Sequence, residues 1–143
     1  MYEKKLFSKN NKTFEKFEKK ILFIKKNFNN NISFLKKKYT AIIGYGSPAK
    51  ASTAMNYFGI QDDLIEKVID DNHLKVNKFI PGTNIKIVSS KSIKRKQKCI
   101  LVLAWNMFDE IKLKNQSLSS AFISIRDLYD EDFVKKFLAN KFI

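Results

Sequence analysis

Residues 40–50 of the chain read Thr-Ala-Ile-Ile-Gly-Tyr-Gly-Ser-Pro-Ala-Lys. A short β-branched apolar run here ends at two closely spaced glycines, Gly44 and Gly46. Ser47 is a residue type that caps helix N-termini, and Pro48 is favoured at the first helical position. The stretch therefore predicts a strand, a tight turn and a helix in direct succession.

The same alternation continues toward the C-terminus. The helix from Pro48 to Phe58 should close at Gly59, because glycine suits the left-handed conformation that often follows a helix. Strands are predicted at 64–69, 85–88, 99–104 and 121–125, and helices after Ser89, from Asn106 and over 130–138. The most uniformly apolar of these strands, 99–104, is the candidate central strand. Alternating strands and helices indicate an α/β fold with a mainly parallel sheet and right-handed crossovers.

The segment before the turn, residues 1–39, favours an amphipathic helix. Apolar side chains three and four apart form one stripe, which consists of Phe14, Phe17, Ile21, Ile24 and Phe28. The helix is predicted over 12–28. Asn27 and the asparagine run 29–31 are poor helix formers that interrupt it, although the stripe could resume after them. We expect the whole stripe to be covered, either by the domain formed by residues 40–143 or in a homodimer through this helix.

Positive charge is concentrated in the same segment. The 143-residue chain has a formal net charge of +14, of which residues 1–39 contribute +9 from 12 basic and 3 acidic side chains. Such a charge can indicate nucleic acid as a partner. However, Arg95 and Arg126 are the only arginines among 28 basic residues, and arginine is preferred for bidentate phosphate and base contacts. We therefore expect only non-specific attraction to nucleic acid, with a small basic nucleic-acid-binding protein as the alternative.

The composition excludes several other kinds of protein. The single cysteine, Cys99, and the single histidine, His73, exclude a disulfide framework and metal sites made of several thiolates or paired histidines. No apolar run approaches the roughly 18 to 20 residues that span a bilayer, and the N-terminus lacks a secretory signal. We expect a cytoplasmic protein with no membrane partner and no metal, in which Cys99 is a core residue and His73 an exposed loop residue.

The glycine turn could carry chemistry. Gly44, Gly46 and Ala49 satisfy the loose pattern G-x-G-x-x-G/A, and Asp70 follows the next predicted strand. Such turns let backbone N–H groups and a helix N-terminus approach a phosphate, while the acid accepts a hydrogen bond from a ribose hydroxyl. Lys50 could add a full positive charge. The pattern alone supports a structural use of the turn and a ligand-binding use about equally.

Three ordered blocks of sequence go beyond the glycine pattern. They are Gly44-Tyr45-Gly46-Ser47-Pro48-Ala49-Lys50 with Asn56-Tyr57-Phe58-Gly59-Ile60, Asp70 with Lys78-Phe79-Ile80-Pro81-Gly82-Thr83, and Leu103-Ala104-Trp105-Asn106 with Asp109-Glu110-Ile111. Together they resemble the signature of the C-terminal domain of S-adenosylmethionine-dependent sugar C-methyltransferases. At the positions of Asn77 and Asn84 that family has glycine and often histidine. The segment after Glu110 is shorter before its strand, and residues 127–143 depart from the family's usual ending.

The resemblance implies a Rossmann-like three-layer domain that binds a nucleotide-sugar. The family's full-length enzymes also contain a cysteine-rich zinc segment and a methyl-donor domain, neither of which this sequence contains. S-adenosylmethionine is therefore expected only on a separately encoded methyltransferase that this chain would support, or the chain is a fragment of such an enzyme. The candidate ligand-binding residues are Gly44, Tyr45, Gly46, Ser47, Pro48, Lys50, Asn56, Asp70, Lys78, Pro81, Gly82, Thr83, Trp105 and Asn106. No catalytic residue is assigned.

A dinucleotide-dependent oxidoreductase fragment is a less favoured alternative. In that reading Asp70 would hold an NAD ribose. The sequence offers no substrate domain and no convincing proton-transfer pair beside it.

Overall fold

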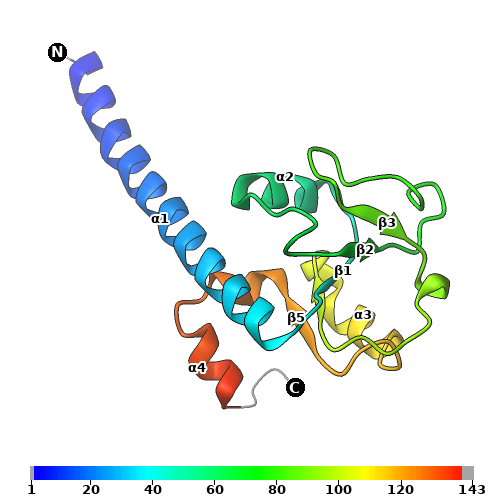
Figure 1. Ribbon diagram of the computed structural model, residues 1–143. Coiled ribbons are helices and arrows are strands. Elements are labelled where there is room, and N and C mark those ends of the chain that lie inside the picture. Colours follow the sequence, from blue (N-terminus) through cyan, green and yellow to red (C-terminus); the bar gives the residue numbers. More distant parts are fainter. Residues whose placement is uncertain (1, 140–143) are drawn as a thin grey trace.

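The computed structural model describes residues 2–139, and the side chains of residues 11–139. A five-stranded, all-parallel sheet lies at its centre, in the order β3-β2-β1-β4-β5 (Figure 1). The strands are β1 (Ile43–Tyr45), β2 (Lys67–Ile69), β3 (Lys86–Val88), β4 (Ile100–Val102) and β5 (Phe122–Ser124). The helices are α1 (Tyr2–Lys38), α2 (Ala49–Phe58), α3 (Phe108–Lys114) and α4 (Phe133–Leu138), with the 3₁₀ turns η1 (Ser90–Ser92), η2 (Trp105–Met107) and η3 (Ile125–Tyr129). The predicted α/β class, with its parallel sheet and N-terminal helix, is confirmed.

The centre of the sheet is β1, and the prediction that 99–104 forms the central strand was wrong. β4 is fully buried as expected, but it lies one place away, between β1 and β5. β1 fits the central position because Gly44 has no side chain. A Cβ atom there would lie 2.7 Å from Cγ2 of Val68 in β2, so only glycine permits this close packing between neighbouring strands.

Two apolar cores cover the two faces of the sheet and make the domain three-layered. Successive strand residues point to opposite faces. On one face Val68, Leu101 and Ile123 join residues of α1, α2, η3 and α4 in the larger core. On the other face, the strand residues that point away from the larger core pack against α3; Ile43 and Ile69 are among them.

α1 is one continuous helix, so the predicted interruption at the asparagines was wrong. Asn27 and Asn31 are buried, and they face η3 rather than solvent. Nδ2 of Asn31 donates hydrogen bonds to the backbone carbonyls of Leu128 and Asp130, and Nδ2 of Asn27 donates to that of Tyr129. These contacts across nearly 100 residues of sequence stabilise the helix where its local propensity is poor.

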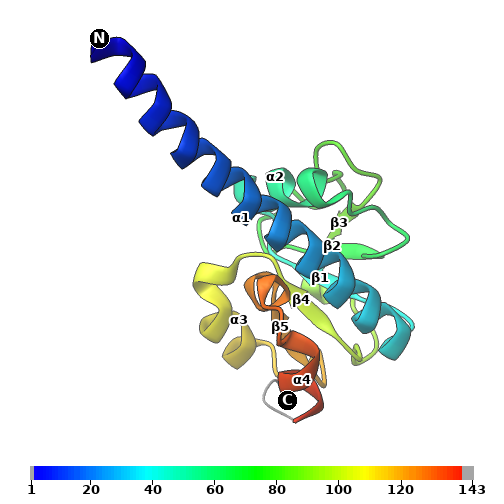
Figure 2. The ribbon, with the colours of Figure 1, turned by 90° about the vertical axis from the view of Figure 1, so that its left-hand side faces the viewer.

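The two halves of α1 have different surroundings. The C-terminal half crosses the domain and buries Phe28, Ile32 and Leu35 in the larger core. The N-terminal half projects away from the domain as a free arm (Figures 1 and 2). Phe14 and Phe17 are 70% and 62% exposed in the single chain, so the domain does not cover this part of the stripe, and its cover in a homodimer stays a prediction.

The start of α2 differs by one residue from the prediction. Pro48 is the N-cap with extended backbone, and the helix begins at Ala49. Ser47 makes no capping hydrogen bond to this helix, because its side chain bonds to Asp70 instead. The helix ends, as predicted, at Gly59, whose φ of 70° lies in the left-handed region. Among the described residues, no helix combines the length and the apolar character needed to cross a membrane.

Candidate functional site

The carboxyl ends of the parallel strands gather most of the predicted site residues along one edge of the sheet. The turn Gly46–Ser47 follows β1, Asp70 follows β2, and Trp105 and Asn106 come shortly after β4. Ligands of open α/β sheets bind outside this edge. The edge is therefore the candidate functional site.

A clamp between Ser47 and Asp70 fixes the turn after β1. Both the backbone N–H of Ser47, at 2.8 Å, and its hydroxyl donate to Oδ2 of Asp70. The Asn72 N–H donates to the other carboxylate oxygen of Asp70, at 2.9 Å. Lys75 reaches across the clamp: its ammonium donates to the Ser47 carbonyl at 2.9 Å and lies 3.6 Å from Oδ2 of Asp70. The acid predicted to accept from a ribose hydroxyl is thus occupied by the chain's own donors.

These contacts keep the Asp70 carboxylate ionised. Burial raises the pKa of Asp70, but the hydrogen bonds from Ser47 and Asn72, together with the nearby Lys75 ammonium, lower it further than burial raises it. The pKa of Asp70 therefore lies below its ordinary value.

The glycine turn itself offers fewer free donors than the sequence suggested. The Gly46 N–H donates to the Ile69 carbonyl at 2.7 Å, the Ser47 N–H is bound to Asp70, and Pro48 has no N–H. The donors that remain for an anion are those of the first turn of α2, at Ala49 and Lys50, which a helix leaves without intrahelical partners. Gly46 is required for packing: its φ is 84°, and a Cβ there would lie 2.7 Å from that of Ala104.

A hollow of about 470 Å³ opens beside this first turn of α2. Its polar wall is formed by Ser47, Ser52 and the side chains of Lys75 and Lys78. Its apolar wall consists of Ala49, Phe79, Ile80, Pro81 and Ile87. Phe79 is 56% exposed, so its ring is accessible to a flat ligand group. The volume is typical of small-molecule sites, and the polar groups all favour an anion.

Of the predicted residues Asn56, Pro81, Gly82 and Thr83, only Pro81 lines this hollow, and the four are held mainly by contacts with one another and with the backbone. Nδ2 of Asn56 donates to the Pro81 carbonyl at 2.8 Å. Gly82, at φ 78°, lies so close to Asn56 that an added Cβ would collide with its Oδ1. The Thr83 hydroxyl donates to the carbonyl of Ile80 at 2.9 Å. Asn56 of the first sequence block thus holds the loop of the second block in place.

Asn77 keeps the shape of the preceding segment. It has a φ of 67° and is the only residue other than glycine with a positive φ in the described part of the chain. Glycine and asparagine are the residues that adopt this region most readily. The replacement of the resembling family's glycine by asparagine is therefore compatible with the same backbone turn.

Trp105 stacks between two cations at the other end of the edge. The Lys50 ammonium lies 4.5 Å from the centroid of its ring and the Arg126 guanidinium carbon lies 4.7 Å from it. Trp105 and Arg126 line a second hollow of about 400 Å³ with Phe108, Ser124 and Asp127. Asn106 is exposed and does not line this hollow. Lys50 therefore connects the first turn of α2 with Trp105 through a cation–π contact.

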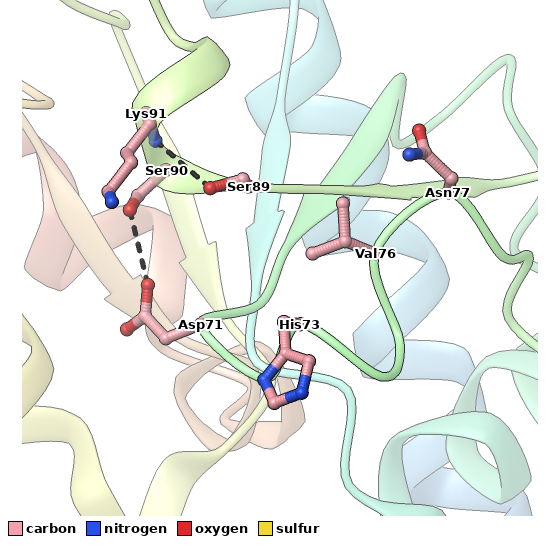
Figure 3. Close-up of a pocket in the computed structure, with 7 residues that line it drawn as sticks. All are labelled: Asp71, His73, Val76, Asn77, Ser89, Ser90 and Lys91. Atoms are coloured by element: carbon pink, nitrogen blue, oxygen red, sulfur yellow. Dashed lines mark hydrogen bonds between the residues drawn. The ribbon is translucent and has the colours of Figure 1, made fainter.

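A third hollow, of about 440 Å³, lies beyond the ends of β2 and β3 (Figure 3). Asp71 accepts hydrogen bonds from the hydroxyl of Ser90, at 3.2 Å, and from that of Tyr45, at 2.7 Å. Burial, followed by the contact with Asp71, strongly raises the pKa of Tyr45. The predicted residue Tyr45 is thus a buried hydrogen-bond donor that anchors Asp71. His73 lines the hollow as an exposed loop residue, as the sequence predicted.

The sequence analysis did not predict a place in the site for Lys75, Asp71 and Arg126. It also did not predict that the ring of Phe79 lines a hollow. Lys75 and Phe79 lie near the Lys78 block, and the spacing of loop residues does not show which side chains turn inward. Arg126 could have been suspected, because it directly follows the predicted strand 121–125 at the ligand-binding edge.

Metal ligands and the cysteine thiol are the remaining groups to consider in residues 11–139. These residues contain no group of three histidine, cysteine or acidic side chains placed to hold a metal. Burial raises the pKa of the Cys99 thiol to about 12, so this core cysteine is an unreactive thiol.

A parallel α/β domain with hollows of ligand size along the carboxyl edge of its sheet has the architecture of the open α/β folds. A comparison with protein families is more specific: it matches residues 1–123, from α1 into β5, to the C-methyltransferase C-terminal domain. The chain belongs to this family, which confirms the resemblance found in the sequence. A search among curated proteins found no significant match.

Proposed function

We propose that this chain is a nucleotide-sugar-binding module that supports methyl transfer by a separate, cytoplasmic methyltransferase. The observation that carries the proposal is the hollow beside the first turn of α2, where Lys75, Lys78 and the helix N-terminus surround one cavity. A diphosphate has the charge and size to lie there. Membership of a C-methyltransferase family, together with the sequence resemblance to sugar C-methyltransferases, supports a sugar as the group attached to the diphosphate.

Each wall of the hollow suits a different part of such a ligand. The diphosphate would accept hydrogen bonds from the N–H groups of Ala49 and Lys50 and from the exposed ammonium of Lys78. The ring of Phe79 offers a stacking surface for the base. Asp70 would act as a positioning residue, because it holds the turn and the ammonium of Lys75 in place.

The methyl donor is assigned to the partner. This chain has four glycines, and the two in its only glycine-rich turn are enclosed by Val68 and Ala104. Because both glycines are closed in by side chains of the domain itself, their turn does not offer a separate loop for a second cofactor. S-adenosylmethionine would then be held by the separate methyltransferase, and this chain alone would not transfer methyl groups.

Calorimetric titration with UDP-glucose and with UDP tests the proposal. Lys78→Ser should weaken binding by about tenfold, since it removes a charge-assisted contact to phosphate. Lys94→Ser is the matched control, because Lys94 is an exposed lysine that does not line the hollow. Gly46→Val is unsuitable, since the side chain would collide with Ala104 and disrupt the fold whether or not a ligand binds.

Two results would contradict the proposal. One is the absence of heat and of any shift in melting temperature with a panel of nucleoside diphosphates and their sugars. The other is equal weakening by Lys78→Ser and Lys94→Ser, which would indicate general charge attraction only. S-adenosylmethionine titrated in the same way should give no signal, and micromolar binding would place the donor on this chain instead.

A further inference from the structure

The free arm of α1 and a groove at its base form one continuous apolar surface. Phe14 and Phe17 lie on the arm with their rings mostly exposed. One to two turns further on, Ile21 and Ile24 line a groove of about 420 Å³ together with Thr53, Ala54, Tyr57, Phe58 and Tyr129. We call this surface, from Phe14 to Tyr57, the arm surface. Figures 1 and 2 show the arm projecting past α2 with no other element beside its outer turns.

The arm surface has the dimensions of a helix-binding site. Phe14, Phe17, Ile21 and Ile24 recur three and four residues apart, so they lie on one face of α1. Ten residues of helix correspond to about 15 Å, or nearly three turns. Exposed apolar surfaces of this kind on otherwise well-packed domains mark interaction sites, and an amphipathic helix laid into a groove is a common way to fill them.

The surroundings of the arm surface are cationic. At about 100° per residue, Lys20 and Lys25 flank the stripe on α1 together with Glu18, and the other lysines of residues 11–26 lie on the remaining faces of the helix. Lys50 lines the groove, and the Lys25 ammonium lies 4.8 Å from the centroid of the Tyr57 ring at its edge. None of the residues that line the groove is acidic. An occupant that presents carboxylates around an apolar stripe would therefore meet complementary charge on the arm.

Charge also distinguishes between the possible occupants. A second copy of this chain would bring Lys20, Lys25 and Lys50 against the same three lysines, with Glu18 as the acidic residue beside them, so like charges would outnumber opposite ones in a homodimer along the arm. Nucleic acid would match the lysines, but it would leave the phenylalanines and the groove without apolar contacts. We propose that the arm surface binds an acidic, amphipathic helix of a partner protein. This inference is independent of nucleotide-sugar binding at the carboxyl edge of the sheet.

A designed peptide pair provides the test. The probe is an 18-residue helical peptide with leucines three and four apart and glutamates on its other faces; its counterpart has lysine in place of every glutamate. Binding of each fluorescein-labelled peptide to the full chain is measured by fluorescence anisotropy at low and moderate salt. The glutamate peptide should bind, and the lysine peptide should not.

Two variants of the same helix locate the contact. Phe17→Ser, on the arm surface, should weaken binding of the glutamate peptide by about tenfold or more, as expected for an aromatic anchor. Phe23→Ser is the matched control: Phe23 is also exposed, at 48%, but it lies on a different face of the helix. Since both side chains are exposed, both variants should fold, and both should bind UDP-glucose as the unmodified chain does.

Three outcomes would overturn the inference. Equal binding of the two peptides, or equal losses for Phe17→Ser and Phe23→Ser, would exclude a specific acidic partner on this face. A dimer in sedimentation experiments that Phe17→Ser dissociates would identify a second copy as the occupant. Tighter binding of an oligonucleotide than of the glutamate peptide, with no effect of Phe17→Ser on it, would identify the arm as a nucleic-acid-binding element.

Discussion

Replacing Asn31 by alanine separates local helix propensity from tertiary contact in α1. The side chain of Asn31 is 3% exposed. Its Nδ2 donates to the Leu128 carbonyl at 3.0 Å and to the Asp130 carbonyl at 2.8 Å. Alanine is the best helix former, so propensity alone predicts that Asn31→Ala stabilises the helix. The hydrogen bonds predict the opposite.

The structure allows the size of the effect to be worked out. Each lost hydrogen bond costs about 1 kcal/mol on average, and more when the acceptor stays buried without a donor. The gain in helix propensity offsets about 0.5 kcal/mol of this. Asn31→Ala should therefore lower the free energy of unfolding by about 1.5 to 3 kcal/mol. At about 3 to 4 °C for each kcal/mol in a domain of this size, the melting temperature should fall by about 5 to 12 °C.

Asn30→Ala is the matched control, because Asn30 occupies the same stretch of helix but is exposed. It should leave stability unchanged or raise it by up to about 0.6 kcal/mol. Thermal unfolding followed by circular dichroism at 222 nm measures both variants. If Asn31→Ala is as stable as Asn30→Ala, the contacts with η3 do not hold the helix together, and its continuity must have another cause.

Two further predictions concern the turn after β1. Gly46→Ala should destabilise the domain by several kcal/mol more than Gly59→Ala in urea unfolding. Both glycines have a positive φ, but a Cβ at Gly46 would lie 2.7 Å from that of Ala104, whereas Gly59 has open space. Equal effects of the two substitutions would mean that backbone strain alone matters. Because the folded-state pKa of Asp70 lies below its ordinary value, the stability that this carboxylate contributes is present above about pH 4 and is lost as the pH falls through its lower, folded-state pKa. Asp70→Asn should remove that part of the acid destabilisation, and a variant whose stability falls as steeply as that of the unmodified chain below pH 4 would contradict the assignment.

The order of elements could be predicted from the sequence, because strands and helices here differ clearly in their apolar period. The run 40–43 with Gly44 and Gly46 marks a strand and turn by local chemistry alone. Which strand lies at the centre could not be predicted in this way. Uniform apolarity pointed to 99–104, yet the central place of β1 depends on the close approach of Gly44 to Val68, which is a property of two strands together.

The helix α1 shows the same limit. A run of asparagines predicts an interruption as long as the chain is considered locally. The donors of Asn27 and Asn31 find their acceptors about 100 residues away in η3. No spacing rule within the first 39 residues contains that information, so the error follows from a tertiary contact that overrides propensity.

The three sequence blocks that identify the family act mainly on one another. Ser47 of the first block is bound to Asp70 of the second, and Asn56 of the first is bound to the Pro81 carbonyl and lies against Gly82. The blocks therefore help to determine the shape of the loops, and the side chains of Ser47, Asp70 and Asn56 make their hydrogen bonds within the protein. Under the proposed function, specificity for a ligand would come from side chains that line the hollow without a structural role in the loops. Lys78 and Phe79 are the clearest of these. Substitutions at such positions should change which ligand binds while leaving the fold intact.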